Sequence, residues 1–378
     1  MKAILRSGFL ALAIVLALAV GLSQSAEMKL VDLSFDGVTK LILIRGTLEK
    51  GDADHFEQIS EAVSHALVVL EGPGGRVEEA LAIGAAIRSK GYATYVAPDM
   101  RCFSACAVIW VSGARRRMSE KSKIGFHAVY VKDEDGPRET GMGNAELGSF
   151  LTHLGLPVEA IRFITFAAPN EMTLLTAARA RAVGIDIHLD RGVFGPGSDY
   201  FQASVHTLAQ QAGELAMMEN NCSRFFGVDA GRFKRLAEEQ ISIGHESIDG
   251  ADFGRLLAIA IDPIKEDWRI TNSQLRWCVA AEERLRTQQV KVLPEGPSYN
   301  CDKAGIPTEH AICGDKNLSA SDRVLAALYR YYKSVPDPAL VDWVKTTQVV
   351  WLRSRNRCGD QTRCIMSKYL GRTQELLQ

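Results

Sequence analysis

Residues 101–107 read Arg-Cys-Phe-Ser-Ala-Cys-Ala, with Ser104 at the centre of the stretch. A strand-like run over Tyr92–Ala97 precedes it, and an apolar, helix-like run over Ser104–Ser112 follows it. This order predicts a strand, a tight turn and a helix that begins at Ser104. The hydroxyl group would then lie at the positive end of the helix, where a developing negative charge is favoured.

The alternation of strand-like and helix-like runs continues on both sides of this stretch. The spacing of apolar residues predicts strands and helices in turn. The strand-like runs are Val38–Arg45, Ala66–Leu70 and Lys123–Val131, and the helix-like runs are Asp54–Val63 and Val77–Ile87. Strands that alternate with helices are typical of an α/β fold with a mostly parallel sheet.

Two further signals surround Ser104 and would complete a nucleophilic site. Gly74 and Gly75 follow a strand-like run, and the missing side chains let the backbone approach a substrate. The amides of Gly75 and Ala105 are the candidate oxyanion hole, and His127 is the candidate general base. Each signal also has a plain structural explanation: Ser104 as a helix cap, the glycines as a turn, His127 as a packed strand residue. Their combination in this order favours an active site.

These residues carry a resemblance to a known family. Pro73-Gly74-Gly75, Ser104-Ala105 and Gly125-Phe126-His127 together resemble the Clp protease proteolytic subunit and its relatives in the crotonase-like superfamily. The Cys-x-Ser-Ala-Cys pattern of residues 102–106 is most similar to exported, Clp-like members. The resemblance spans residues 38–190 and implies a ββα spiral. It also implies Ser104 as nucleophile, His127 as base, and the Gly75 and Ala105 amides as oxyanion hole.

The third member of a catalytic triad does not match the family pattern. In the Clp subunit an Asp precedes a Phe-Leu-Ser-Ala helix start, and Asn170–Ala177 occupies that region here. Met172 stands at the aspartate position, with Glu171 beside it. Glu171 is therefore the candidate to orient His127. A Ser-His dyad and a site that has lost activity both remain open.

The start of the chain has the pattern of a secretory signal peptide. A basic beginning precedes the apolar run Phe9–Gly21, and the small residues of Ser23–Ala26 follow. This predicts a signal peptide over residues 1–26, cleaved after Ser25 or Ala26. The apolar run is short for a membrane span, so no span is expected after cleavage. The mature chain is expected in the periplasm or secreted.

Composition excludes several classes of protein. The 378 residues include 44 Lys and Arg against 45 Asp and Glu, so no nucleic-acid partner is expected. The eight cysteines fit an oxidising compartment. Their spacing lacks the paired ligand pattern of a zinc site, so no metal and no cofactor are expected.

Turn-rich stretches divide the chain after the α/β part. A Clp/crotonase-like domain is predicted over 28–192, followed by a break at 192–198. Residues 199–290 have a helical pattern and no assigned role. A second break over Lys291–Asn300 precedes another helical region at 297–378.

The last region has a signature of its own. Pro297–Ala304, Glu309–Cys313 and Trp351–Arg355 resemble the small helical domain named after the LprI lysozyme inhibitor, over 297–378. In that family the cysteines pair locally. The resemblance therefore implies two bridges, Cys301–Cys313 and Cys358–Cys364. A generic exported interaction module is favoured over lysozyme binding, because the region is modestly basic and so are lysozymes.

Four cysteines remain. By elimination, Cys222 and Cys278 are the candidate third bridge, a pairing that the sequence leaves open. Cys102 and Cys106 are either a bridge that clamps the loop of Ser104 or two buried thiols. A catalytic cysteine is disfavoured, because Ser104 holds the nucleophile position.

These observations predict an exported, ATP-independent Clp-like serine hydrolase, a peptidase that acts on short or unfolded polypeptides. The alternative is an inactive envelope protein that keeps the scaffold and binds lysozyme or another envelope protein through its C-terminal domain. A crotonase-type acyl-CoA enzyme is disfavoured, because CoA is not expected outside the cytoplasm. A homo-oligomer stays open.

Overall fold

The computed structural model describes residues 25–32, 39–134, 136–190 and 199–378. The predicted signal peptide, apart from Ser25 and Ala26, lies outside the described residues. So does the predicted break at 192–198.

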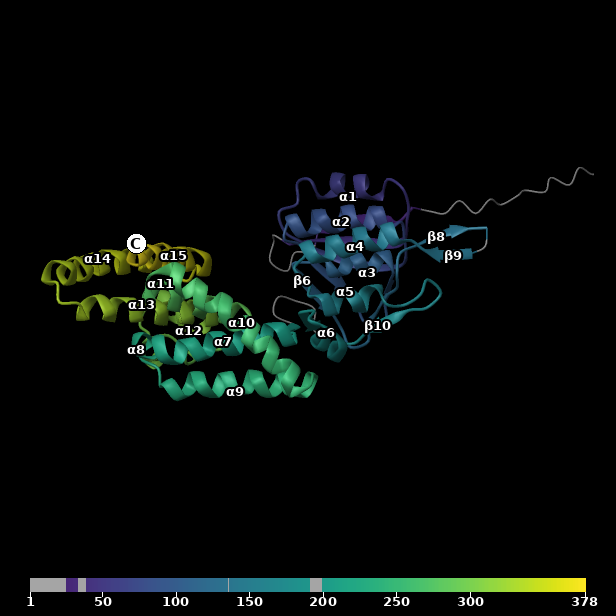
Figure 1. The fold of residues 1–378 in the computed structure, drawn as a ribbon. Helices are drawn as coiled ribbons and strands as arrows, with labels where there is room; N and C mark the ends of the chain where they lie inside the picture. The colour runs from purple at the N-terminus through teal and green to yellow at the C-terminus, as the bar shows by residue number, and fades with distance from the viewer. Residues whose placement is uncertain (1–24, 33–38, 135, 191–198) are drawn as a thin grey trace, which may run out of the picture.

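A curled, mostly parallel sheet forms the first half of the molecule (Figure 1). Its strands are β1 (Glu27–Asp32), β2 (Lys40–Leu48), β3 (Ala66–Gly75), β4 (Ala93–Val96), β5 (Arg101–Phe103), β6 (Arg115–Met118), β7 (Lys123–Phe126), β10 (Thr173–Leu175), β11 (Ile187–Asp190) and β12 (Asp199–Gln202). Residues 66–70 of β3 are all buried, as expected of a central parallel strand covered on both faces.

The sheet divides at β3. This strand pairs in parallel with β2 on one edge. On the other edge its residues 67–69 pair with β4, whereas Gly72 pairs with Cys102 of β5. One branch then continues through β6, β11 and β12, and the other through β7 and β10. The division curls the sheet and brings the ends of β3, β5 and β7 together.

Helices cover the curled sheet. They are α1 (Asp52–Ser60), α2 (Val77–Ser89), α3 (Ala105–Val111), α4 (Gly141–His153), α5 (Val158–Thr165) and α6 (Ala177–Val183). Every residue of α3 is buried, so this helix lies at the centre of the core rather than on its surface. The α/β fold predicted from the sequence is confirmed.

The predicted strand over Lys123–Val131 is divided in the structure. β7 ends at Phe126, and Tyr130 begins β8 (Tyr130–Asp133), which forms a separate hairpin with β9 (Gly136–Glu139). Between them, the amide of Ala128 donates to the carbonyl of Ala167 at 2.8 Å. The expectation of one continuous strand is therefore wrong, because segments far along the chain take the backbone hydrogen bonds.

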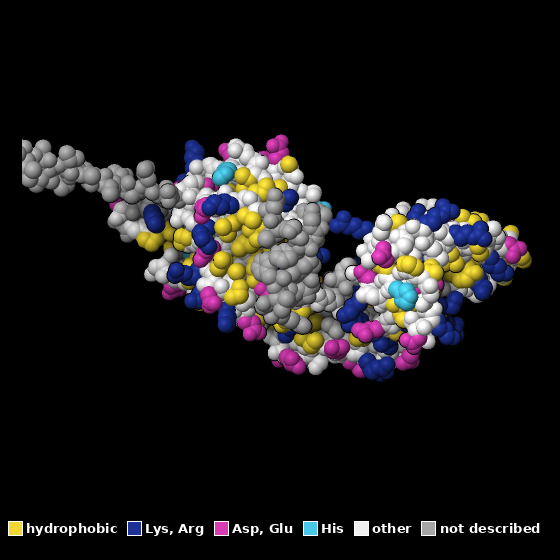
Figure 2. All heavy atoms as spheres, turned by 180° about the vertical axis from the view of Figure 1, so that it is seen from behind, with side chains coloured by type: hydrophobic (Ala, Val, Ile, Leu, Met, Phe, Trp, Pro, Cys, Tyr) yellow, Lys and Arg dark blue, Asp and Glu magenta, His cyan; other side chains and the backbone are white. Residues whose placement is uncertain are grey.

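The second half of the molecule is a helical body, on the left of Figure 1. It contains α7 (Val205–Asn221), α8 (Ser223–Phe226), α9 (Ala230–Ser247), α10 (Gly250–Thr271), α11 (Gln274–Thr287), η1 (Cys301–Lys303), α12 (Pro307–Gly314), α13 (Lys316–Ser334), α14 (Pro338–Asn356) and α15 (Thr362–Leu377). One buried cluster joins side chains such as Leu215, Trp277, Leu328 and Tyr369. Residues on both sides of the predicted break at 291–300 therefore share a core. Figure 2 shows Lys and Arg side chains spread over the outer part of this body.

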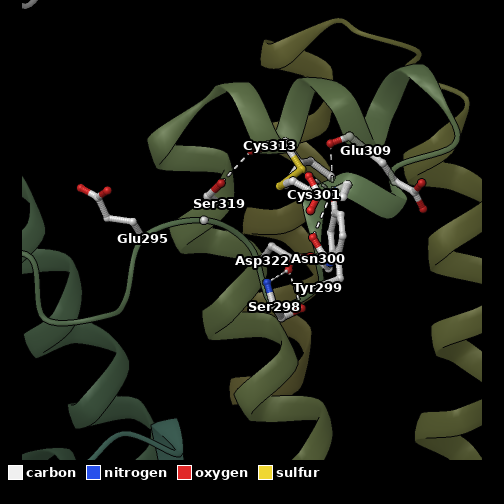
Figure 3. The surroundings of a disulfide bond; sticks show 12 residues. Glu295, Ser298, Tyr299, Asn300, Cys301, Glu309, Cys313, Ser319 and Asp322 are labelled. Atoms are coloured by element: carbon white, nitrogen blue, oxygen red, sulfur yellow. Dashed lines mark hydrogen bonds between the residues drawn. A yellow bond between two sulfur atoms is a disulfide. The ribbon is translucent and has the colours of Figure 1, made fainter.

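Four disulfide bridges use all eight cysteines, and three of them lie in the helical body. Figure 3 shows the Cys301–Cys313 bridge beside Tyr299 and Asp322. Asp322 accepts a hydrogen bond from the Ser298 amide at 2.7 Å. The disulfide-stapled helical region predicted from the sequence is confirmed. Among the described residues, no helix combines the length and the apolar composition needed to cross a membrane.

Candidate active site

Ser104 connects β5 to α3 in a backbone conformation that side-chain-bearing residues rarely adopt. Its φ is 56° and its ψ is −126°. The amide of Ser104 donates to the carbonyl of Gly125 in β7 at 2.9 Å. Such a conformation costs about 1–3 kcal/mol and persists only where neighbouring structure enforces it. Strain of this kind is typical of functional positions.

The Cys102–Cys106 bridge closes around Ser104. Its two Cα atoms are 5.2 Å apart, and both cysteines are buried. The bridge joins the last strand residues of β5 to the first turn of α3. It therefore fixes the loop that carries Ser104, and it leaves neither thiol free to act as a nucleophile.

Gly74 and Gly75 let β3 pass close to Ser104. Their φ angles are 110° and 138°, a region that favours glycine. A Cβ on Gly74 would lie 2.7 Å from the Cβ of Ser104 and 3.1 Å from the amide nitrogen of Ala105. A Cβ on Gly75 would lie 2.2 Å from the carbonyl oxygen of Leu48. Any larger residue would displace the backbone beside Ser104 if it replaced Gly74, and the backbone of Leu48 if it replaced Gly75.

Ser104, His127, Gly75 and Ala105 line one cavity of about 720 Å³. The structure thus brings four of the five residues singled out for catalysis to a single site. The cavity lies between the end of β3, the start of α3, the segment after β7 and the first turn of α4.

His127 lies immediately after β7 and is half-buried. Its Nδ1 is 2.7 Å from the carbonyl oxygen of Ala128, and its ring centroid is 5.3 Å from that of Tyr130. A neutral ring that donates from Nδ1 to this carbonyl leaves Nε2 free to accept a proton. Ser104 and His127 make no hydrogen bond with each other in the described structure.

Glu171 lies in the segment between α5 and β10. Its side chain is exposed and makes neither a hydrogen bond nor an ion pair with the described residues, and only its amide is engaged, with Ala168 at 2.9 Å. Thr173, two residues further on, pairs with Phe126 of β7. Glu171 is thus near the same end of β7 as His127, and no hydrogen bond or ion pair of the described structure joins the two side chains.

Sequence reasoning did not single out the charged and apolar residues around the cavity. The charged ones are Glu49, Arg76, Glu78, Lys132 and Glu146. Arg76 directly follows Gly75, and this adjacency is the one sequence signal that could have identified it. Lys132 and Glu146 reach the cavity from the β8–β9 hairpin and from α4, which only the folded chain brings together. In the part of the chain that is described, no group of His, Cys, Asp and Glu side chains could hold a metal ion.

Exposed apolar side chains also border the cavity. Met142, in the first turn of α4, is 72 % exposed, and Val131, in β8, is 44 % exposed. Such side chains offer contacts to apolar groups of a bound ligand. The site therefore combines a strained serine, a histidine and an apolar rim.

No protein-family model matches this chain, and no curated protein matches it either. Among solved structures, the chain is similar to a serine-to-alanine mutant of the 1510-N membrane-bound stomatin-specific protease, with 17 % identity and a TM-score of 0.32. The match covers 39 % of this chain and 76 % of that one. A lysine-to-alanine mutant of the same protease, in complex with a substrate peptide, has 16 % identity and a TM-score of 0.33, covering 43 % and 84 %. Likenesses at this level assign no activity to the chain.

Proposed function

We propose that the chain is an exported serine hydrolase, a peptidase that works without an ATPase partner. The observation that carries this proposal is the strained backbone of Ser104 at a cavity that also contains His127. Holding a serine at positive φ between a strand and a helix exposes its hydroxyl group, as in the sharp nucleophile turns of other hydrolases.

The proposed reaction is acyl transfer. The Oγ atom of Ser104 attacks an amide carbonyl while Nε2 of His127 takes the hydroxyl proton. The amides of Gly75 and Ala105 would stabilise the oxyanion. His127 then returns the proton to the leaving amine, and water hydrolyses the acyl-enzyme by the same route.

We assign the orientation of the His127 ring to the carbonyl of Ala128, which lies 2.7 Å from Nδ1. A carbonyl at that distance favours the tautomer with the proton on Nδ1. This arrangement makes a Ser-His dyad the first candidate. Glu171 remains the proposed third member of a catalytic triad. Its side chain would have to turn toward His127 to orient the ring.

The proposed substrates are short or unfolded polypeptides. The cavity of about 720 Å³ is large enough for a few side chains but not for a folded domain. The rim residues Met142 and Val131 would contact apolar side chains of such a substrate. The four disulfides support a periplasmic or secreted location, because bridges persist in oxidising compartments.

Labelling with a fluorophosphonate probe tests the proposal. The purified mature protein is expected to be labelled, and Ser104→Ala is expected to lose all labelling. Ser149→Ala, an exposed serine of α4, serves as the matched control and should label like the wild type. Labelling that survives in Ser104→Ala, or a wild type that does not react, would count against the hydrolase.

One observation favours a second candidate function. Ser104 and His127 are not hydrogen-bonded, although catalytic hydrogen bonds are often loose until substrate binds. An inactive envelope protein that binds a partner through its LprI-like C-terminal domain would have the same structure. The fluorophosphonate experiment separates the two, because a binding protein leaves the probe unreacted.

A further inference from the structure

Asp52, the first residue of α1, is a buried carboxylate without a cation. Its side chain is 1 % exposed. It accepts hydrogen bonds from the Ser25 hydroxyl, from the Ala26 amide at 3.2 Å and from the Glu49 amide at 2.8 Å. Within the described residues, no Lys, Arg or His side chain pairs with it. A buried carboxylate is costly unless a positive charge compensates it.

Ala26 is held firmly next to this carboxylate. It is 4 % exposed, and Met28, two residues on, is 7 % exposed. A Cβ on Gly46 would lie 3.6 Å from the Cα of Ala26, and a Cβ on Gly72 would lie 2.2 Å from the carbonyl oxygen of Gly46. The backbone at Ala26 therefore lies beside Gly46 of β2, which in turn lies against β3, and its nitrogen donates to Asp52.

We propose that Asp52 is the binding site for the amino terminus of the processed chain, which begins at Ala26. A signal-processing endopeptidase of the exporting cell would hydrolyse the Ser25–Ala26 bond. Water supplies the hydroxyl group for the Ser25 carbonyl and a proton for the Ala26 nitrogen. The resulting α-amine is protonated at neutral pH, with a reference pKa of about 7.7–8.0, and it becomes the missing cation.

The burial of Ala26 distinguishes the two predicted cleavage positions. Cleavage after Ser25 places the ammonium group on the nitrogen that already contacts Asp52. Cleavage after Ala26 would remove a buried residue and leave the new amine one residue away on β1. Removal of Ser25 takes one hydroxyl donor from the carboxylate, and an ammonium group has enough protons to replace it.

The pair would also brace one wall of the cavity. Asp52 holds the amide of Glu49, and Glu49 and Leu48 both line the cavity. The Leu48 carbonyl accepts from the amide of Arg76 at 2.9 Å, directly after Gly75. The amino terminus is thus linked through the β2–α1 turn to the backbone beside Ser104. The pairing itself does not depend on the hydrolase proposal.

The first test is the mass of the exported protein. Intact-mass and N-terminal peptide analysis of full-length protein exported by a bacterial host should give Ala26 as the first residue. A mature chain that begins at Glu27, or one that retains Ser25, would overturn the proposal.

The second test compares two purified forms, one that begins at Ala26 and one that begins at Ser23. Both are released from a fusion partner that leaves no added residue. The Ala26 form should melt about 5 °C higher, because only it supplies the cation. Asp52→Asn should abolish the difference, and Asp54→Asn, an exposed residue of the same helical turn, should preserve it. A difference that persists in Asp52→Asn, or none in the wild type, contradicts the pairing.

A third measurement needs no variant of Asp52. At neutral pH, an N-hydroxysuccinimide ester should acylate the α-amine of the Ala26 form at least about tenfold more slowly than that of the Ser23 form, because a buried, paired ammonium is both protonated and shielded. Equal rates for the two amines would rule out the pair even if Asp52→Asn failed to fold.

Discussion

Three structural features stabilise the strained backbone of Ser104. The amide bonds to Gly125, the Cys102–Cys106 bridge closes the loop, and Gly74 leaves room where a Cβ would collide. The strain of about 1–3 kcal/mol is therefore compensated by the surrounding fold rather than by the serine itself.

Removal of the proposed base should reduce hydrolysis as much as removal of the nucleophile. His127→Ala is expected to lower kcat/KM on an unfolded polypeptide by about 10²–10⁴-fold, because nucleophile and base act as a unit. His153→Ala, an exposed histidine of α4, is the matched control. Steady-state kinetics would check this, and a fully active His127→Ala would return His127 to a packing role.

The same assay tests what orients the ring. If the carbonyl of Ala128 does so, Glu171→Gln should change kcat/KM by less than about twofold, since the Glu171 side chain is exposed and makes no hydrogen bond or ion pair with the described residues. A loss above about tenfold in Glu171→Gln would instead assign the third catalytic position to Glu171.

Ser104 and His127 could be singled out as candidates from the sequence, but their geometry could not be predicted. The Pro-Gly-Gly, Ser-Ala and Phe-His patterns are local and were readable from the chain. The positive φ of Ser104 depends on the bond to Gly125, which is 21 positions away in the chain. Long-range contacts of this kind leave no local trace in the sequence.

At the scale of elements, alternation of strands and helices was predictable because each run is apolar with a clear period. The division of the predicted strand 123–131 was not. Val129 donates to the side chain of Asn144 at 2.7 Å, and Ala128 donates to Ala167. Asn144 lies in α4 and Ala167 in the segment after α5, so the strand ends here although the apolar run of the sequence continues.

The bridge beside Ser104 should matter for activity more than for stability. It spans 4 positions, and the chain-entropy relation gives about 2 kcal/mol for so short a loop. We expect the double variant Cys102→Ala, Cys106→Ala to stay folded but to react at least about tenfold more slowly with the fluorophosphonate probe, because the loop is no longer fixed.

The Cys222–Cys278 bridge provides the control. It spans 56 positions in the helical body, and its loss should cost about 4 kcal/mol of stability. The double variant Cys222→Ala, Cys278→Ala should unfold at a lower urea concentration, and its rate of labelling by the fluorophosphonate probe should be unchanged. A pattern in which both variants lose the same fraction of reactivity would show that the first bridge has no special role.

In the molecule as a whole, the two largest buried apolar clusters of the described residues are separate, one in the curled sheet and one in the helical body. The sequence predicted both halves from composition and period. It placed a break at 291–300, and its turn-forming residues do form an irregular connection. The helices before and after this connection share one core. This packing could not be predicted, because the pattern of apolar residues within each segment carries no information about contacts between segments.

A buried carboxyl group makes the helical body sensitive to pH. Glu282 of α11 is 3 % exposed, and burial, opposed by Arg286 at 3.5 Å, raises the pKa of its carboxyl to about 7. The folded state thus binds this proton more tightly than the unfolded chain does. The stabilisation is complete below about pH 4.5 and is lost as pH rises through about 7, by about 3 kcal/mol in all.

Glu282→Gln should remove this pH dependence. Urea unfolding at pH 5 and pH 8 should show a stability loss in the wild type and a smaller one in Glu282→Gln. Glu283→Gln, its exposed neighbour, is expected to behave as the wild type. The same drop between the two pH values in Glu282→Gln and in the wild type would show that another group is responsible.

The bridge around Ser104 has a consequence for timing. Thiol-based reductants keep cysteines reduced in the cytosol. A newly synthesised chain would therefore lack the Cys102–Cys106 bridge, and the loop of Ser104 would not be fixed until the chain is exported. The proposed amine on Asp52 likewise exists only after the leader has been removed. A protease that needs both events would be inactive in the cytosol and could not cleave the proteins there. It would become active only after export.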